Sequence, residues 1–378
     1  MTIKNSGTQL AFSEIESEFG QPDNGRSLGR YRSTDSEFKN KNMGTLSNLP
    51  LDTGIPTSGE IKFSDFYGKK LNMVVDYFST AENREDVGAN TMAATWRYNN
   101  LSGKVQVVGG YRDRPTGSVS GYVLSSSGWQ NGKKIFIHVN KEIGSAKASQ
   151  QSQRNRVAVR TGNWPSGTTL QIDIGSSGRN QGAGGNGRQG ATNSGTPAQA
   201  FTGTSGLGIE YPAQINNSGI IRCGYGGGGG GAGSWSDPNK NPRDFGRSGG
   251  GGGGGAGIPA GDGGPQNTGG YGSAGNGPGD QAGKGKAGSN ANKNSGGNGG
   301  DGGDHGEGGG EAGDGGNGGD RVDGAQSGSA GSPNRGGGGS PGNNGHGIIF
   351  SSSSVQSNSS GNKTLSSGNG GVVVGGVS

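Results

Sequence analysis

Hydrophobic residues in the first half of the chain come in short runs that alternate with polar positions. The runs Ile135–Val139 and Leu170–Ile174 show the alternation of half-buried strands, with His138 as an exposed residue on the polar side. Turns rich in Gly, Asn, Ser and Pro separate these runs. The expected strands are Leu71–Phe78, Val105–Val108, Val119–Leu124, Lys134–Val139, Val157–Thr161 and Thr169–Ile174. Short strands at this spacing predict a β-sandwich or jelly-roll-like domain over residues 71–175.

Residues 1–70 contain a short imperfect repeat. Leu10–Ile15 is echoed by Ile61–Phe66, and each copy predicts a brief strand followed by a serine that caps a helical turn. In the first copy, Ser13 and Glu16 have the spacing of a capping box. The basic stretch between the copies is too poor in apolar residues to fold alone, so we expect a docking element that becomes ordered on a partner. Its expected contact residues are Phe12, Ile15, Phe63, Phe66 and Tyr67.

Residues 176–378 have a different pattern, because glycine dominates it. About one-fifth of the 91 glycines precede Gly175, so roughly a third of the second half is glycine. Such a composition is typical of fibrous or disordered chains, because glycine loses much backbone entropy on ordering and adds no apolar side chain. The zone contains two uninterrupted runs, Gly226–Gly231 and Gly249–Gly255. It also contains apolar patches, which a disordered linker does not need: Leu207–Ile209 with Tyr211, Ile220–Ile221, Ile348–Phe350 and Val372–Val374.

The most informative part of this zone has a period of three. Asn298, Asp301, Asp304 and Glu307 recur at every third position, and after a slip of one residue Glu311, Asp314, Asn317, Asp320 and Asp323 continue the spacing. A helix of the polyproline II type has three residues per turn, so these side chains share one edge and the other two edges are bare. Bare edges let neighbouring helices approach and bond through their backbones. The pattern predicts a bundle of polyglycine II helices, with an acidic rim and the all-glycine runs at its centre.

Three other structures share some features of the glycine-rich zone. A collagen triple helix also has period three, but it needs abundant proline and no phase slip, and the whole chain has 14 prolines. A disordered linker is the simplest alternative. Calcium binding by the acidic positions is the third, although residues on one edge stand about 9 Å apart along a straight helix, too far to share one ion. The expected fold class is therefore mostly β and irregular, with a small N-terminal docking element, a β-sandwich or jelly-roll-like domain and, over residues 176–378, a glycine-rich polyglycine II helix bundle.

Charge, cysteine content and the N-terminus narrow the setting. The net charge of +5 is modest and scattered, and it does not predict nucleic-acid binding. Cys223 is the single cysteine, so no intramolecular disulfide is expected. The first residues lack the apolar stretch of a signal peptide, and no run approaches the length of a membrane helix, so we expect no membrane insertion. A protein made in a host cytoplasm and released by lysis as part of a virion fits these observations.

Four segments of the glycine-rich zone carry a resemblance to a known family: Gly182–Gly187, Gly206–Tyr211, Ile215–Ile221 and Gly224–Gly231. Over residues 178–345 the chain resembles the receptor-binding adhesins at the tips of long tail fibres of T-even-type phages. The resemblance implies packed polyglycine II helices whose variable distal loops bind a host surface protein or glycan. The Phe-Ser-[Asp/Glu]-apolar repeat of the N-terminal region instead resembles virion structural proteins of tailed phages, including those infecting cyanobacteria. It implies attachment to other phage tail or fibre proteins, and localisation in the virion tail.

The resemblance also implies where receptor binding occurs. The loop between the two longest glycine runs contains Trp235, Arg243 and Phe245, and the next loop contains Tyr271, Lys284 and Lys286. Aromatic and basic side chains are frequent anchors of recognition. For Trp235 and Phe245, covering the edge of the bundle is an equally good interpretation.

Two other classes of function remain as alternatives. A non-adhesive structural component of a baseplate, collar or head fibre is the first. An enzyme is the second, but a depolymerase would need paired carboxylates on a rigid scaffold. The three histidines, His138, His305 and His346, have no recognisable nucleophile motif beside them. We therefore expect no catalytic residue, no metal site and no cofactor.

Overall fold

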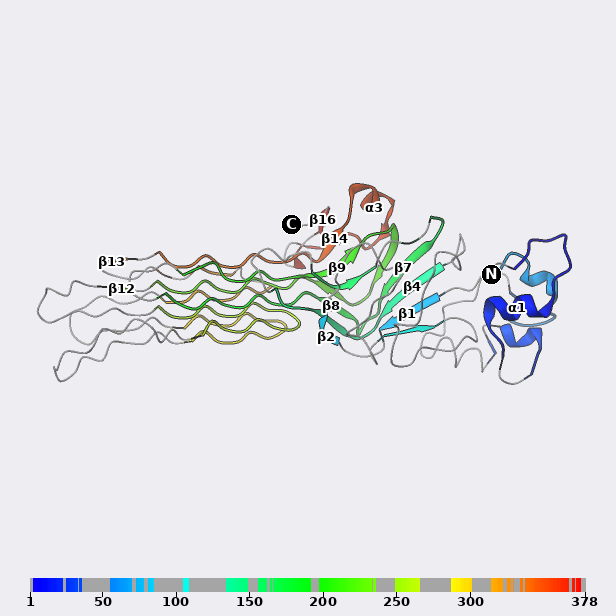
Figure 1. The fold of residues 1–378 in the computed structure, drawn as a ribbon, viewed down its shortest axis with the longest axis horizontal. Coiled ribbons are helices and arrows are strands. Elements are labelled where there is room, and N and C mark those ends of the chain that lie inside the picture. Colours follow the sequence, from blue (N-terminus) through cyan, green and yellow to red (C-terminus); the bar gives the residue numbers. More distant parts are fainter. Residues whose placement is uncertain are drawn as a thin grey trace, which may run out of the picture.

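The computed structural model describes residues 3–22, 25–32, 34–35, 55–69, 73–77, 81–84, 105–108, 134–148, 156–161, 164, 166–191, 197–232, 234–235, 249–265, 287–300, 314–321, 325–327, 329, 334–335, 337–366, 369–370 and 372–374. Figure 1 shows an elongated molecule, with a helical N-terminal element at one end and a body of strands in the middle. The glycine-rich segments run side by side toward the other end.

The N-terminal element consists of α1 (Phe12–Phe19) and two short 3₁₀ helices, η1 (Leu28–Tyr31) and η2 (Phe63–Phe66). It encloses a core of its own, in which Tyr31 and Phe66 meet edge to face with ring centroids 5.9 Å apart. The buried residues of this core are Ile3, Leu10, Ile15, Phe19, Tyr31, Ile55 and Phe66. The sequence interpretation underestimated this region, because a few large aromatic rings far apart in the sequence supply much of the buried area.

The two copies of the repeat form equivalent helical turns rather than strands. Helix α1 begins at Phe12 and η2 at Phe63. The Glu14 carboxylate accepts the backbone N–H of Ala11 at 2.9 Å, and the Asp65 carboxylate accepts that of Lys62 at 2.7 Å. The expected capping box of Ser13 and Glu16 is wrong, because Ser13 already lies inside the helix and the acidic residue at the third helical position caps it.

The strands of the body form three main sheets. Their bounds are β1 (Met73–Tyr77), β2 (Ala81–Arg84), β3 (Val105–Val108), β4 (Lys134–Val139), β5 (Glu142–Ser145), β6 (Val157–Arg160), β7 (Thr169–Ile174), β8 (Arg179–Gln181), β9 (Ser205–Ile209), β10 (Ala213–Asn217), β11 (Ile220–Arg222), β14 (Ile348–Phe350), β15 (Ser360–Gly361) and β16 (Val372–Val374). A short helix, α3 (Ser353–Asn358), lies between β14 and β15. The sheet orders are β15-β10-β7-β4-β1-β3, β11-β8-β5-β2 and β16-β14-β9-β6.

From β4 to β11 the chain visits the three sheets in rotation, so the strands wind into a coil. The pairs β4–β7, β5–β8 and β6–β9 are parallel, and each joins one turn of the coil to the next. This is the arrangement of a parallel β-helix. Its core is filled by apolar residues from all three sheets: Tyr77, Ile135, Ile137, Val139, Ile143, Ala158, Val159, Trp164, Leu170, Ile172, Ile174, Leu207, Ile209, Ala213, Ile215, Ile221, Ile348 and Phe350.

Most of the expected strands are present. The bounds of β3, β4 and β7 match the expected ones, and β1 and β6 lie within theirs, whereas Val119–Leu124 is outside the described residues. His138 is half-buried and stands in register with Asp76 and Asp173.

The expected sandwich is not confirmed. Sandwiches are built from antiparallel strands, whereas β1–β3 is the antiparallel pair among the described strands of the three main sheets. The sheets also cross the expected boundary at residue 175, because β7 pairs with β10. Short, regularly spaced strands suit both architectures, and the pattern alone does not show the direction in which they pair.

The glycine-rich residues form extended tracts that leave the coil and return to it. The first tract continues directly from β8, the second leads into β9 and the third continues from β11. We define the glycine tracts by their described residues as 182–191, 197–204, 223–232, 249–257, 261–265, 287–292, 296–300, 314–320, 325–329 and 337–347, without residue 328.

Candidate functional site

The candidate site is built on the hydrogen bonds between glycine tracts. Among the described residues, backbone hydrogen bonds link the tract 249–257 to six other tracts. Every third N–H group of this tract bonds to the same neighbour: those of Gly249, Gly252 and Gly255 bond to the tract 182–191, at 2.9, 2.8 and 2.8 Å. The tract 223–232 is linked in the same way to six tracts. This differs from the collagen alternative, in which three chains share one axis.

The all-glycine runs lie at the centre of these tracts. Every residue of Gly226–Gly231 and of Gly249–Gly255 is buried. A Cβ added at Gly253 would lie 1.9 Å from the carbonyl oxygen of Gly297, and one added at Gly228 would lie 1.9 Å from that of Gly316. Glycine is required there because backbone, rather than a movable side chain, occupies the space where a side chain would begin.

The residues of the three-residue period lie at the rim, as far as they are described. Asn298, Asp314 and Asn317 are exposed, and Asp320 is half-buried. The other positions of the pattern, Asp301, Asp304, Glu307, Glu311 and Asp323, lie outside the described residues.

Rim asparagines have a role that the sequence interpretation missed. The side-chain oxygen of Asn317 accepts the N–H of Gly299 at 2.9 Å, and that of Asn186 accepts the N–H of Asp262 at 2.9 Å. The side-chain oxygen of Asn344 accepts a hydrogen bond from the N–H of Gly226 at 3.0 Å. A tract at the rim has fewer neighbouring carbonyls, and these amides bond N–H groups that would otherwise depend on water.

Removing one such amide has a measurable cost. We expect Asn317→Ala to destabilise the protein by about 1 kcal/mol, because the N–H of Gly299 loses its acceptor. Asn298→Ala is the matched control, since Asn298 is also an exposed rim residue and its side chain makes no hydrogen bond to another described residue. Urea unfolding of both variants measures the difference, and equal stability of the two would contradict this role.

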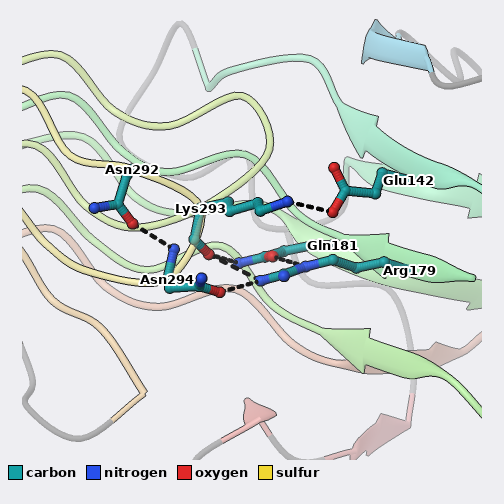
Figure 2. A network of polar contacts seen from close by, with 6 residues as sticks. All are labelled: Glu142, Arg179, Gln181, Asn292, Lys293 and Asn294. Carbon is teal, nitrogen blue, oxygen red and sulfur yellow. Dashed lines mark hydrogen bonds and ion pairs between the residues drawn. The ribbon is translucent and has the colours of Figure 1, made fainter. Parts of the chain in front are cut away.

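One end of the tracts is fixed to the coil. Figure 2 shows Lys293 paired with Glu142 at 2.6 Å, while the guanidinium of Arg179 donates to the carbonyl of Lys293 and to the side chain of Asn294 at 3.0 and 2.8 Å. Burial, and then the neighbouring charge of Arg222, lower the pKa of the Arg179 guanidinium. These contacts hold the turn at 293–295 against β5 and β8.

The turn after the tract 249–257 is fixed at the same end. A Cβ on Gly144 of β5 would lie 2.2 Å from the carbonyl oxygen of Ile258, so this turn contacts the strand directly. An ion pair of 2.7 Å between Lys147 and Asp262 adds a third link. The glycine tracts are thus anchored to the coil at the end where their turns are short.

The opposite end of the tracts carries the longer connecting segments. We define these five segments as residues 192–196, 233–248, 266–286, 301–313 and 330–336. The described residues that flank them are joined to one another: the N–H of Gly249 bonds to Ala191, that of Ala232 to Ser329, and that of Ser329 to Asp314, at 2.9, 3.0 and 2.8 Å. The bonds Gly288 to Gly264 and Gly315 to Gly300, at 3.0 and 2.9 Å, place the remaining flanks in the same layer. All five connecting segments therefore leave the tracts at one end, called the distal end below.

The expected receptor-binding residues belong to two of these segments. Trp235 lies in β12 (Ser234–Trp235), which pairs with β13 (Asn334–Arg335) of another connecting segment. No sequence pattern links Trp235 to Asn334 and Arg335, because the positions are about a hundred residues apart. The remaining candidates lie outside the described residues: Arg243, Phe245, Tyr271, Lys284 and Lys286.

The five expected docking residues differ in how deeply their side chains are buried. Ile15 and Phe66 are fully buried in the core of the N-terminal element, and Phe12 and Tyr67 are partly buried. Phe63 is 41% exposed and lies edge to face with Phe12, with ring centroids 6.1 Å apart. Of the five, Phe63 offers the largest exposed aromatic surface.

Two kinds of feature are absent from the described part of the chain. None of its helices is long and apolar enough to cross a membrane. None of its groups of His, Cys, Asp and Glu could hold a metal ion.

An elongated protein that anchors glycine tracts on a coil of strands, with its longer connecting segments leaving the tracts at the far end, has the build of a fibrous attachment protein. The family model of the phage tail fibre adhesin Gp38 matches residues 116–327, which is more than half of the chain. The chain belongs to this family of structural adhesins, and the protein is a phage tail fibre adhesin, part of the virion tail.

The comparisons with solved structures and with curated sequences give weaker information than the family model. A solved structure, the gp37-gp38 adhesin tip complex of the bacteriophage S16 long tail fiber, is similar at 16% sequence identity with a TM-score of 0.32. The similarity covers 83% of this chain and 90% of that chain. No curated protein sequence matches this chain.

Proposed function

We propose that this adhesin binds a receptor on the host cell surface through the connecting segments of its distal end. The observation that carries the proposal is that the residues flanking the five connecting segments are hydrogen-bonded to one another. The five segments therefore start from the same end of the tracts. Segments 233–248 and 266–286, with Trp235, Arg243, Phe245, Tyr271, Lys284 and Lys286, are the proposed contact regions. A host surface protein or glycan is the proposed partner.

The scaffold in this proposal is a bundle of polyglycine II helices. Two observations support it. The N–H groups of the tract 249–257 change partner with a period of three, as a helix with three residues per turn requires. The six neighbours of each central tract also match the number that surrounds a rod in hexagonal packing. Such a bundle holds its ends rigidly without an apolar core of its own.

Competition with the phage tests the proposed function. The purified protein should occupy the receptors on host cells, so cells incubated with it should adsorb phage at least about tenfold more slowly. The measurement is the adsorption rate at rising concentrations of protein. Unchanged adsorption at saturating protein would favour the alternative of a non-adhesive component of a baseplate, collar or head fibre.

The N-terminal element is proposed to attach the adhesin to another tail or fibre protein, with Phe63 as the central contact. Its exposure supports this, since an exposed large aromatic residue is a frequent anchor of an interface. We expect Phe63→Ser to reduce the amount of adhesin per virion at least about tenfold, a loss of roughly 1.4 kcal/mol or more. Lys62→Ser is the control, because Lys62 is the neighbouring exposed residue. Quantitative mass spectrometry of purified virions measures both, and normal incorporation of the Phe63 variant would contradict the proposed contact.

A further inference from the structure

Asparagine directly precedes glycine at four places in the described glycine tracts, and this pair of residues is chemically labile. The four pairs are Asn186–Gly187, Asn298–Gly299, Asn317–Gly318 and Asn344–Gly345. The backbone nitrogen of the residue after an asparagine can attack the side-chain amide carbon, and a glycine there has no Cβ to obstruct the approach. Each pair is therefore open to deamidation, and the folded structure decides which of them reacts.

Closure of the ring in this reaction requires two freedoms in the folded protein. The asparagine side chain must turn toward the backbone, and the peptide bond after it must rotate, which breaks any hydrogen bond that its N–H makes. A pair that is held at both points reacts only when the tract opens locally. Its rate is therefore reduced to the small fraction of time that it spends open.

Three of the pairs are held at both points. The side-chain oxygen of Asn186 accepts the N–H of Asp262, and the N–H of Gly187 donates to the carbonyl of the same residue, at 2.9 and 2.8 Å. The side chains of Asn317 and Asn344 also accept backbone N–H groups, at 2.9 and 3.0 Å. The N–H groups of the glycines that follow these two donate to backbone carbonyls of other tracts, both at 2.9 Å. Deamidation of these three asparagines requires that tracts separate.

Asn298 differs from the other three. It is exposed, and its side chain makes no hydrogen bond to another described residue. The N–H of Gly299 donates to a side chain, the oxygen of Asn317 at 2.9 Å, whereas the other three glycines donate to backbone carbonyls. Asn317 is itself exposed at the rim, so a change of its side-chain rotamer breaks this bond without separating two tracts.

We propose that Asn298 is the site at which the described glycine tracts deamidate, and that Asn317 controls the rate by holding the N–H of Gly299. The nitrogen of Gly299 loses its proton to hydroxide and attacks Cγ of Asn298. The bond from Cγ to Nδ2 then breaks, and Nδ2 takes a proton from water and leaves as ammonia. Water opens the resulting cyclic imide. Cleavage of the bond between Cγ and the glycine nitrogen gives aspartate, and cleavage of the bond to the backbone carbonyl carbon gives isoaspartate.

The isoaspartate product alters the main chain itself, because its side-chain Cβ becomes part of the backbone. The residues that follow it are then out of step with the neighbouring tracts. The first bonds affected are those from Gly299 to Asn317 and from Gly300 to Gly251, the second of which is 2.7 Å long. Gly300 lies at the distal end, where its carbonyl also accepts the N–H of Gly315 at 2.9 Å. Deamidation therefore loosens this end of the tract 296–300, whatever the adhesin binds.

Mass spectrometry of the full chain, incubated in mildly alkaline buffer, tests the site. Tryptic digestion and peptide fragmentation give the aspartate and isoaspartate at each asparagine against time. In the folded protein Asn298 should react at least about tenfold faster than Asn186, Asn317 and Asn344, and in urea the four rates should lie close together. Equal rates in the folded protein, or a faster reaction at one of the other three, overturn the proposal. A tenfold preference that persists in urea also overturns it, because the fold is then not the cause.

Variants at the rim test the control by Asn317. Asn317→Ala should raise the rate at Asn298 roughly fivefold, the factor that corresponds to the loss of one hydrogen bond, and should leave the rate at Asn186 unchanged. Asn344→Ala is the matched control, because it removes a rim amide that accepts the N–H of Gly226 instead. An unchanged rate at Asn298 in Asn317→Ala, or an equal rise in both variants, overturns this control.

The effect on the fold is measured on the incubated protein. The unaltered chain should lose melting temperature as isoaspartate accumulates at position 298. Asn298→Gln should lose less over the same period, because the longer side chain closes a larger ring and does so more slowly. Equal losses in the two proteins overturn the inference that deamidation at this position loosens the tract.

Discussion

Replacing residues 236–248 with a Gly-Ser connector of equal length is expected to reduce phage adsorption at least about 100-fold. The replacement removes Arg243 and Phe245 and leaves β12 in place. Loss of two anchoring side chains costs about 3–4 kcal/mol of binding free energy, which is a factor of roughly 100 to 1,000 in affinity. The adsorption rate constant of virions carrying the variant is the measurement.

The same replacement should leave the fold intact, which makes the result interpretable. The tracts on either side of the segment are held by their own backbone bonds, such as that from Gly231 to Gly250 at 2.8 Å. The melting temperature of the purified variant should therefore stay within about 2 °C of the original value. Normal adsorption would remove the segment from the receptor site, and virions that fail to assemble would point to a structural role.

Adding a single methyl group at the centre of the glycine tracts is expected to lower the stability of the protein more than replacing a whole connecting segment does. In Gly253→Ala the new Cβ would lie 1.9 Å from the carbonyl oxygen of Gly297, so two tracts must separate and their hydrogen bonds must lengthen. We expect a destabilisation of about 3 kcal/mol or more, which for a chain of this length lowers the melting temperature by roughly 4 °C or more. Scanning calorimetry of the full chain measures it.

Two controls show whether the cause is backbone contact. Gly339→Ala makes the same chemical change where the nearest atom, the carbonyl oxygen of Ala198, lies 3.1 Å from the added Cβ, so its effect should be smaller. Asn298→Ala changes a rim residue and should have little effect. If the Gly253 and Gly339 variants melted at the same temperature, close packing of the central tracts would not be the reason for their glycines.

Local patterns predicted local structure well. The bounds of strands β3, β4 and β7 were predicted to the residue, and in β4 and β7 this is because alternation along one strand reflects the burial of one of its faces. The all-glycine runs were expected at the centre of the tracts and are buried there, because a segment without side chains has no edge that must face water.

Features that depend on distant partners could not be predicted. The strand β7 gives no sign that β10 lies beside it, and Trp235 gives none that Asn334 lies opposite. Ile15 and Phe66 were expected at an interface because they are apolar in a polar region, whereas Phe19 and Tyr31 fold back and cover them. In each case the missing information was which residues distant in sequence come together.

The threefold bonding of the tracts restricts how this protein can change over generations. In the proposed polyglycine II geometry, one residue inserted before Asn298 in the tract 296–300 would turn the rest of that tract by a third of a revolution, and the Asn298 side chain would then face a neighbouring backbone. In that geometry, an insertion within a tract keeps the bonding pattern only when it adds residues in multiples of three. The three-residue spacing shifts by one at Glu311, which lies in the connecting segment between the tracts 296–300 and 314–320. A shift at this place leaves the spacing within each of the two tracts unchanged.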